Sequence, residues 1–495
     1  SNLFFNKNAG LFAAFILAVS PFHITWAAAY HDQTMMFFVL LATYFFIKKY
    51  EEEKQVSILS SIFLGIAVLI KIITGVFVTV FAAFILGGLY INYKTNKNLK
   101  NNLKKSIIFL LIILICLLPI VSYNYFLYKE KGIVDLPFAQ FLKINTEFYI
   151  GPGLAHEEGF VLNKLFHNLN SVLVSYFLKE DILSFLIGLC GIIYFCKTIN
   201  EKKFGKFFLL GMFFFSLLFI ASAIVLQTHY TSFFPLFAIF SSGSFIAIST
   251  RFNKSKNYSY IFYSLIIFIL VFNLYSIREP LTSKSGVDKM RSFAIESIDQ
   301  NTLVVVDSRI YRGRIAWIFN DKNYIESNYL NQILEISNAA TQKIPIKMMF
   351  IECINDDCGW GTVKDQPDFN QSVEQIIEAV NNISTKKTTI SGGGSITGKR
   401  GDEVAGHPYF KVYETIIYLD PSIIQTVDET HNHFFYHIPR DVDPEKAFDY
   451  YKVNGAFDLS LNLISYLMLY SLIALALFSI FVPFYLLFST KFINQ

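Results

Sequence analysis

Long apolar stretches recur along most of this 495-residue chain. A stretch of about 17 to 25 apolar residues crosses a bilayer as one helix, because each residue advances the helix by about 1.5 Å. Hydrophobic residues make up 53% of the chain, which is more apolar surface than one soluble core would hide. The sequence therefore predicts a multi-span α-helical membrane protein with about ten spans. The candidate spans are residues 9–27, 33–47, 56–70, 72–91, 106–126, 182–196, 207–226, 231–249, 259–275 and 459–488.

Lysine and arginine gather in alternate loops between these spans. Because basic residues near span ends are retained on the cytoplasmic side, the basic loops are expected to be cytoplasmic and the loops between them outward. The outward loops include residues 127–181 and 277–458. The basic loops contain Lys48, Lys49 and Lys54, Lys94 to Lys105, Lys197 to Lys206, and Arg251 to Lys256.

Residues 277–458 differ from the rest of the chain, since Asp and Glu are frequent and the apolar runs are short. Residues 302–307 and 347–352 are typical of buried strands, and residues 372–381 have the apolar spacing of a helix. The alternation of strand and helix patterns predicts an extracytoplasmic α/β domain before the last span. We therefore divide the chain into a membrane body at 1–276 with the outward loop 127–181, an α/β domain at 277–458, and a last transmembrane helix with a cytoplasmic tail at 459–495.

Several short motifs follow one another along the first spans. Ser20-Pro21 lies near the end of the first span, His31-Asp32 precedes the second, and Gly65 to Lys71 ends the third. Thr228-His229-Tyr230, with Pro235 a few residues later, begins another span. This order resembles the GT-C class of polyprenyl- and dolichyl-phosphate-sugar glycosyltransferases, of the protein-mannosyltransferase and aminoarabinose-transferase type. The resemblance extends over about residues 1–275.

The resemblance implies a membrane glycosyltransferase that moves a sugar, with inversion, from a polyprenyl-phosphate donor to an extracytoplasmic acceptor, which is a protein, a lipid or a glycan. In the family, two spans and an outward loop with an acidic catalytic residue precede the segment that begins here, so we expect an N-terminally truncated chain. The expected partners are the lipid-linked sugar, the acceptor and the bilayer. A net charge of only +4 argues against a nucleic-acid partner. Richness in Lys, Asn, Ile and Phe favours a prokaryotic plasma membrane.

Asp32 and His31 are the candidate catalytic residues. An ionisable pair near lipid is costly unless it is paired or functional. Asp32 is expected to bind a divalent metal ion, Mg²⁺ or Mn²⁺, or to orient the donor phosphate, with His31 beside it. The alternative is that Asp32 only caps the helix that follows, because Asp is a favoured residue at a helix start.

Lys71, His229 and Tyr230 are the candidate residues for binding the donor phosphate. Lys71 follows an apolar run and would hold the phosphate as a point charge at the outward end of its span. Its alternative role is a lysine that extends to the membrane interface. For His229 and Tyr230 the alternative is an interfacial position without ligand contact.

His156, Glu157 and Glu158 form a second candidate metal site, in the outward loop, and a solvated charged turn is the alternative. Cys353 and Cys358 would form a disulfide in an oxidising compartment.

Two other functions remain open from the sequence. A transporter or flippase of lipid-linked sugars would also need an outward cation and an apolar groove. A catalytically inactive membrane subunit would bind a partner through the outward domain.

Overall fold

The structure of this chain is a computed structural model. It describes residues 3–27, 32–71, 74–94, 99–131, 134–135, 138–139, 142, 162–178, 181–200, 203–223, 230–252, 256–277, 286–310, 315, 318–319, 322–327, 330, 334, 342–354, 367–390, 410–420 and 455–489.

The chain divides into two compact units. The first, which we call the membrane unit, contains residues 1–129, 160–276 and 451–495. The second, which we call the α/β unit, contains residues 130–159 and 277–450.

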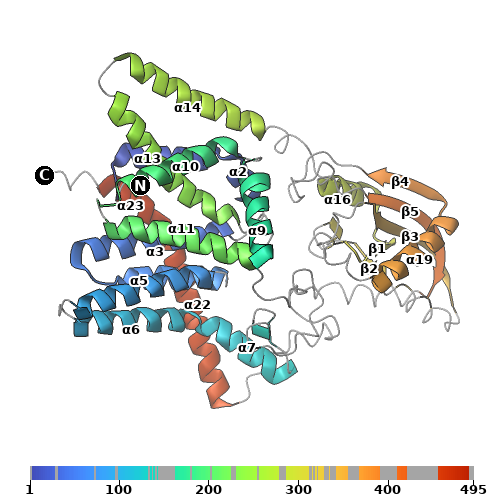
Figure 1. The fold of residues 1–495 in the computed structure, drawn as a ribbon. Helices are drawn as coiled ribbons and strands as arrows, with labels where there is room; N and C mark the ends of the chain where they lie inside the picture. The colour runs from blue at the N-terminus through green and yellow to red at the C-terminus, as the bar shows by residue number, and fades with distance from the viewer. Residues whose placement is uncertain are drawn as a thin grey trace. The chain divides into compact units, whose positions relative to one another are not determined.

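The membrane unit is built from apolar helices, many of which lie side by side (Figure 1). Phenylalanine rings fill the space between them: Phe46 packs on Phe81 and Phe208 with ring centroids 5.0 Å apart in both pairs. The helices are α1 (Lys7–Val19), α2 (Pro21–Ala27), α3 (Asp32–Glu53), α4 (Ile58–Ile70), α5 (Gly75–Lys94), α6 (Leu99–Cys116), α7 (Leu118–Lys131), α9 (Leu162–Asn170), the π-helix η3 (Ser171–Leu178), α10 (Ile182–Lys197), α11 (Lys203–Ala223), the 3₁₀ helix η4 (Thr231–Phe233), α13 (Phe234–Phe252), α14 (Lys256–Ser276), α22 (Ala456–Ser479) and α23 (Phe481–Ser489).

Glycines allow two of these helices to approach each other very closely. A Cβ atom on Gly191 of α10 would lie 1.9 Å from the backbone oxygen of Phe240 in α13. One turn earlier, a Cβ atom on Gly188 would lie 2.6 Å from the ring of Phe237. Small residues at a helix interface let helix backbones pack closely in membranes. The contact between α10 and α13 therefore requires glycine at position 191.

The structure supports fewer clear membrane spans than the sequence predicts. Among the described residues, Thr231–Thr250 and Ala456–Tyr485 are long and apolar enough to cross a bilayer. The pair Leu99–Cys116 and Leu118–Lys129, bent by 44°, makes a third candidate if it counts as one span. Five other apolar helices are shorter, so about ten spans are not confirmed. The shorter helices are Lys7–Val19, Ile58–Ile70, Gly75–Ile91, Ile182–Lys197 and Ser264–Ser276.

The α/β unit contains a five-stranded sheet in the order β2-β1-β3-β5-β4. The strands are β1 (Leu303–Val306), β2 (Tyr324–Glu326), β3 (Ile344–Cys353), β4 (Lys386–Ile390) and β5 (Phe410–Leu419). Strands β2, β1 and β3 are parallel, whereas β5 is antiparallel to both β3 and β4. The apolar runs at 302–307 and 347–352 thus form β1 and part of β3.

Helices α16 (Gly286–Ser297) and α19 (Pro367–Ile383) bury the two faces of this sheet (Figure 1). Alternate residues of β1 point to opposite faces, so Val304 packs in the same cluster as Met290 of α16 and Val305 in the same cluster as Ile376 of α19. All four residues of β1 are buried, as is typical of a parallel strand covered on both faces. The helix predicted at 372–381 is part of α19.

Cys353, the last residue of β3, is disulfide-bonded. Its predicted partner, Cys358, lies outside the described residues. Cys116, Cys190 and Cys196 are free thiols.

Candidate functional site

A buried polar pair joins the end of α1 to the start of α10. Pro21 follows Ser20 and fits the first position of the next helix, so α1 ends at Val19 and leaves Ser20 as its C-cap. Asp181 is the N-cap of α10 and accepts a hydrogen bond from the Ser184 N–H at 3.2 Å. The Ser20 hydroxyl donates to the Asp181 carboxylate, and both residues are almost fully buried. A carboxylate is therefore held inside the membrane unit where two helix ends meet.

A second polar pair lies one turn further along the chain. The backbone N–H of His23 in α2 donates to the Ser20 hydroxyl oxygen at 3.1 Å. The imidazole Nε2 of His23 lies 3.0 Å from the side-chain oxygen of Gln33, in the first turn of α3. The nitrogen of the Gln33 amide is buried and makes no hydrogen bond within the described part of the chain. This amide nitrogen retains its donors for a ligand or for water.

Aromatic rings surround these polar groups. Phe22 stacks on Phe234 with centroids 4.8 Å apart and meets Phe177 edge-on at 5.9 Å. Tyr230 is fully buried and packs against Phe177 and Phe233 with centroids 6.5 and 6.0 Å apart. Tyr230 is a predicted phosphate contact, and its ring lies inside this aromatic cluster.

Lys71 lies where α4 ends. Its backbone N–H bonds to the Ala67 oxygen at 3.1 Å, and its side chain is half-buried. The buried Thr74 hydroxyl lies 2.9 Å from the Ala67 oxygen and 2.6 Å from the Lys71 oxygen. Thr74 thus satisfies carbonyl groups that a helix end leaves open, and it fixes the backbone that carries Lys71.

Asp32 is the first residue of α3, which packs against α4. A short connection joins the two helices at residues 54–57, so Asp32 and Lys71 lie at the same end of this helix pair. The other predicted site residues, His31, His229, His156, Glu157 and Glu158, lie outside the described residues.

Asp181, His23 and Gln33 were not among the site residues predicted from the sequence. An Asp directly before an apolar run is the usual sign of a helix N-cap, and this sign marks Asp181. Nothing local in the sequence indicates that Asp181 contacts Ser20, because 161 residues separate them. The Ser20-Pro21 motif was identified, but its partner was not.

Across the described ranges, no group of three or more His, Cys, Asp and Glu side chains could hold a metal ion. His31 and the cluster at 156–158 lie outside those ranges, so neither predicted metal site is complete among the described residues.

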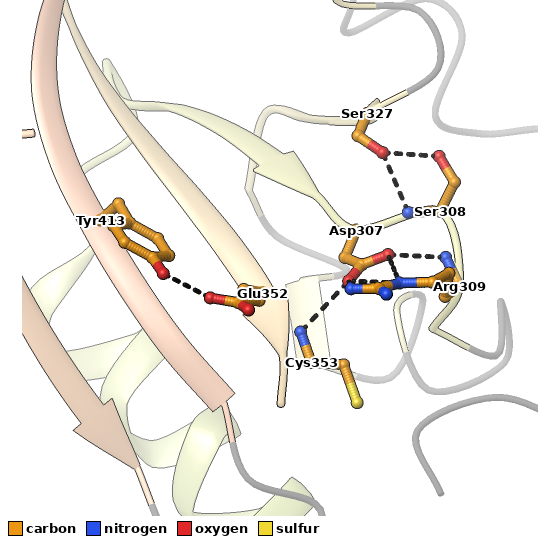
Figure 2. A network of polar contacts seen from close by, with 7 residues as sticks. All are labelled: Asp307, Ser308, Arg309, Ser327, Glu352, Cys353 and Tyr413. Atoms are coloured by element: carbon orange, nitrogen blue, oxygen red, sulfur yellow. Dashed lines mark hydrogen bonds and ion pairs between the residues drawn. The ribbon is translucent and has the colours of Figure 1, made fainter. Parts of the chain in front are cut away.

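A different polar network lies at one edge of the sheet in the α/β unit (Figure 2). The fully buried Asp307 follows β1 and accepts hydrogen bonds from the Arg309 guanidinium, through Nε at 3.0 Å and Nη2 at 2.7 Å. The Cys353 N–H, at the end of β3, donates to the same carboxylate at 3.3 Å. Beside them, the Tyr413 hydroxyl donates to Glu352.

This network changes the acidity of two groups. Burial lowers the pKa of Arg309, but the hydrogen bond and charge of Asp307 and the charges of Glu352 and Glu374 outweigh burial and raise that pKa overall. Burial raises the pKa of Tyr413, and the hydrogen bond to Glu352 raises it further. Arg309 therefore remains a cation and Tyr413 a neutral phenol at physiological pH.

The first helices of the chain are similar to a known protein family. Residues 2–123 match the family model of the dolichyl-phosphate-mannose-protein mannosyltransferases, which is less than half of the chain. The matched segment contains Ser20, His23, Asp32 and Lys71. Neither the curated proteins nor the solved structures include a match. The match and the apolar helices indicate an integral membrane protein. The resemblance inferred from the motifs is confirmed over residues 2–123, as a similarity to the dolichyl-phosphate-mannose-protein mannosyltransferase family.

Proposed function

We propose that this protein is a membrane glycosyltransferase that transfers a sugar from a polyprenyl-phosphate donor to an extracytoplasmic acceptor. One observation carries the proposal: the segment similar to the mannosyltransferases contains Ser20, His23, Asp32 and Lys71. The buried Ser20–Asp181 pair and the half-buried His23 and Lys71 supply polar groups among apolar helices. Ionisable groups in such surroundings are by default functional.

The proposed reaction is a displacement at the anomeric carbon. An acceptor hydroxyl oxygen attacks this carbon, the bond from carbon to phosphate oxygen breaks, and the hydroxyl proton passes to a base. Negative charge grows on the leaving phosphate, so a nearby cation stabilises the transition state. Lys71 is our candidate for this cation, and Asp32 with His31 is our candidate for orienting the phosphate, directly or through Mg²⁺ or Mn²⁺.

The Ser20–Asp181 pair has a positioning role in this proposal. It ties the α1–α2 junction, which precedes Asp32, to the start of α10. Loss of the pair would let these helix ends separate and would move the groups that bind the donor. Small displacements of catalytic groups are costly, since a shift of about 1 Å lowers a rate about a hundredfold.

The test uses the full chain in proteoliposomes with radiolabelled polyprenyl-phosphate mannose, glucose and aminoarabinose, and a membrane extract as the source of acceptors. We expect one of these donors to be consumed and its sugar to appear on an acceptor. A sugar that crosses the bilayer still attached to its lipid would instead identify a transporter. If all donors stay intact and in place, the transferase proposal is wrong.

Single substitutions then test the site. Lys71→Met should lower donor consumption by about a hundredfold or more, the usual effect of removing one group that stabilises developing charge. Lys94→Met is the matched control, because Lys94 is an exposed lysine at the end of α5. Equal activity of the two variants would remove Lys71 from the site. Addition of EDTA, followed by Mg²⁺ or Mn²⁺, tests the metal.

A further inference from the structure

A cleft of about 430 Å³ opens beside the polar network of the α/β unit. It lies between α19 and the sheet edge formed by the end of β3 and the start of β5. Four of its lining residues form one stripe along α19, because positions three, four and seven residues apart share a helix face. The lining residues are Arg309, Glu352, Cys353, Ile354, Tyr413 and, on α19, Glu374, Ile377, Glu378 and Asn381.

The order of the strands in the sheet independently predicts a ligand-binding position near this cleft. The chain passes from β1 to β2 on one side of β1 and then to β3 on its other side. In open α/β sheets, ligands bind beyond the carboxyl ends of the strands at the point where the strand order reverses. Here that point lies between β1 and β3, whose carboxyl ends carry Asp307 and Cys353. Arg309, which follows β1, and Cys353, which ends β3, both line the cleft, so the cleft reaches the position where the topology predicts a ligand.

The lining offers both donors and acceptors of hydrogen bonds. Asp307 binds Nε and Nη2 of Arg309, which leaves the N–H groups of Nη1 as donors within the described part of the chain. Glu374 and Glu378 offer carboxylate oxygens from exposed positions on α19, and the half-buried Asn381 amide both donates and accepts. Ile354 and Ile377 add apolar surface between these groups.

This chemistry excludes several ligand classes. Glu352, Glu374 and Glu378 would repel a phosphate or another anion, and a wholly apolar ligand would leave the polar groups of the cleft desolvated. The carboxylates do not form a metal-binding group among the described residues. A sugar ring fits, because its hydroxyls donate to carboxylates and accept from a guanidinium, while its C–H face packs on isoleucine.

We propose that this cleft binds sugar rings of a neutral glycan. Arg309 and Asn381 would donate to ring and hydroxyl oxygens, and Glu374 and Glu378 would accept from hydroxyls. The inference goes beyond the proposed transfer reaction, because glycan binding by the α/β unit needs neither the lipid-linked donor nor the membrane site.

The experiment screens the full chain in detergent against an array of immobilised neutral oligosaccharides, with oligolysine as a cationic probe. The affinity for the best glycan is then measured by titration calorimetry. We expect at least one neutral glycan to bind, with an affinity that sodium chloride hardly changes, since screening acts on charges. No transfer substrate is present, so failure here is separate from failure of the transferase assay.

Adjacent asparagines provide a matched pair of variants. Asn381 lines the cleft, whereas Asn382 is exposed on the same helix and does not line it. Asn381→Ala and Glu378→Gln should each weaken glycan binding about tenfold or more, which corresponds to about 1.4 kcal/mol, and Asn382→Ala should leave it unchanged. Circular dichroism and the melting temperature verify that each variant folds.

Three results would overturn the inference. In the first, the protein binds no neutral glycan on the array. In the second, the Asn381 and Glu378 variants bind the glycan as tightly as the unaltered chain. In the third, only oligolysine binds, with an affinity that falls steeply as salt is added. The last result would assign the cleft to a basic peptide.

Discussion

The two units of this protein hold their buried carboxylates by different means. In the membrane unit, Asp181 precedes a helix and is held by the backbone N–H groups of Ser184 and Phe22 and by the hydroxyl of Ser20, at the end of a distant helix. In the α/β unit, Asp307 follows a strand and is held by an arginine two residues away and by backbone N–H groups of Arg309 and Cys353. Helix starts and strand ends both leave backbone N–H groups without regular partners, so both attract carboxylates.

The difference lies in where the remaining partners come from. Hydrogen bonds inside a helix use most of its backbone groups, so helices in a membrane contact one another through side chains. Asp458 in the first turn of α22 follows the same rule, since its partners are Lys129 and Tyr125 of α7. At a strand end, neighbouring backbone supplies the partners. The comparison predicts two different sources of stability. In the α/β unit, polar contacts are held by charged groups nearby in the structure, which we call the local-charge account. In the membrane unit, polar contacts depend on how closely the helices pack, which we call the packing account.

Asp307→Ala should have the largest effect on stability. It removes the partner of the partly buried Arg309 and of the Cys353 N–H, and breaking a buried ion pair costs about 3 to 5 kcal/mol. Calorimetric unfolding of the full chain should show a transition at lower temperature. Asp299→Ala, at an exposed position, serves as the control and should stay within about 0.5 kcal/mol. Equal stability of the two variants would contradict the local-charge account.

Gly191→Ala tests the packing account in the membrane unit. The added methyl group collides with the Phe240 backbone, and overpacking of this kind costs about 1 to 3 kcal/mol. Gly87→Ala is the control, because a Cβ there has no neighbour within 4 Å. Thermal unfolding in detergent should show a lower melting temperature for Gly191→Ala alone. A melting temperature equal to that of the control would mean that α10 and α13 do not pack this closely.

Ser20→Ala, Asp181→Ala and the double variant sharpen the comparison further, because each single change removes one partner of the hydrogen bond. A hydrogen bond to a charged group contributes about 1.5 to 3 kcal/mol, and residues in direct contact show coupling energies of about 0.5 to 3 kcal/mol. We therefore expect the effects of the two single changes on unfolding to be non-additive. Additive effects would show that Ser20 and Asp181 act independently.

Glu414 gives the smallest effect, and it depends on pH. Burial raises the pKa of this carboxyl, but hydrogen bonds and charges of Lys386 and Lys347 outweigh burial and hold the pKa below its usual value. A lowered pKa in the folded state stabilises the protein above the ordinary pKa of Glu, about 4.3, and this stabilisation is lost as the pH falls below that value. Glu414→Gln should reduce the decrease in melting temperature between about pH 6 and pH 3. An unchanged pH dependence would exclude this contribution.

The sequence by itself determined where many of the apolar helices lie and where strands β1 and β3 form. Apolar runs and their period depend only on neighbouring residues, so β1, β3 and α19 were predictable, and the motifs from Ser20 to Lys71 were sufficient to identify the family resemblance. Apolar runs alone did not determine the number of spans, because several apolar helices are too short to cross a bilayer by themselves.

Only the tertiary structure decided which residues meet. The Ser20–Asp181 pair joins positions 161 residues apart, and the contact of Cys353 with Asp307 joins positions 46 apart. No local pattern encodes such contacts, since they depend on how helices pack and in which order strands join the sheet. The cleft at the sheet edge has the same origin, because its lining residues, such as Arg309, Glu352 and Tyr413, lie far apart in the sequence.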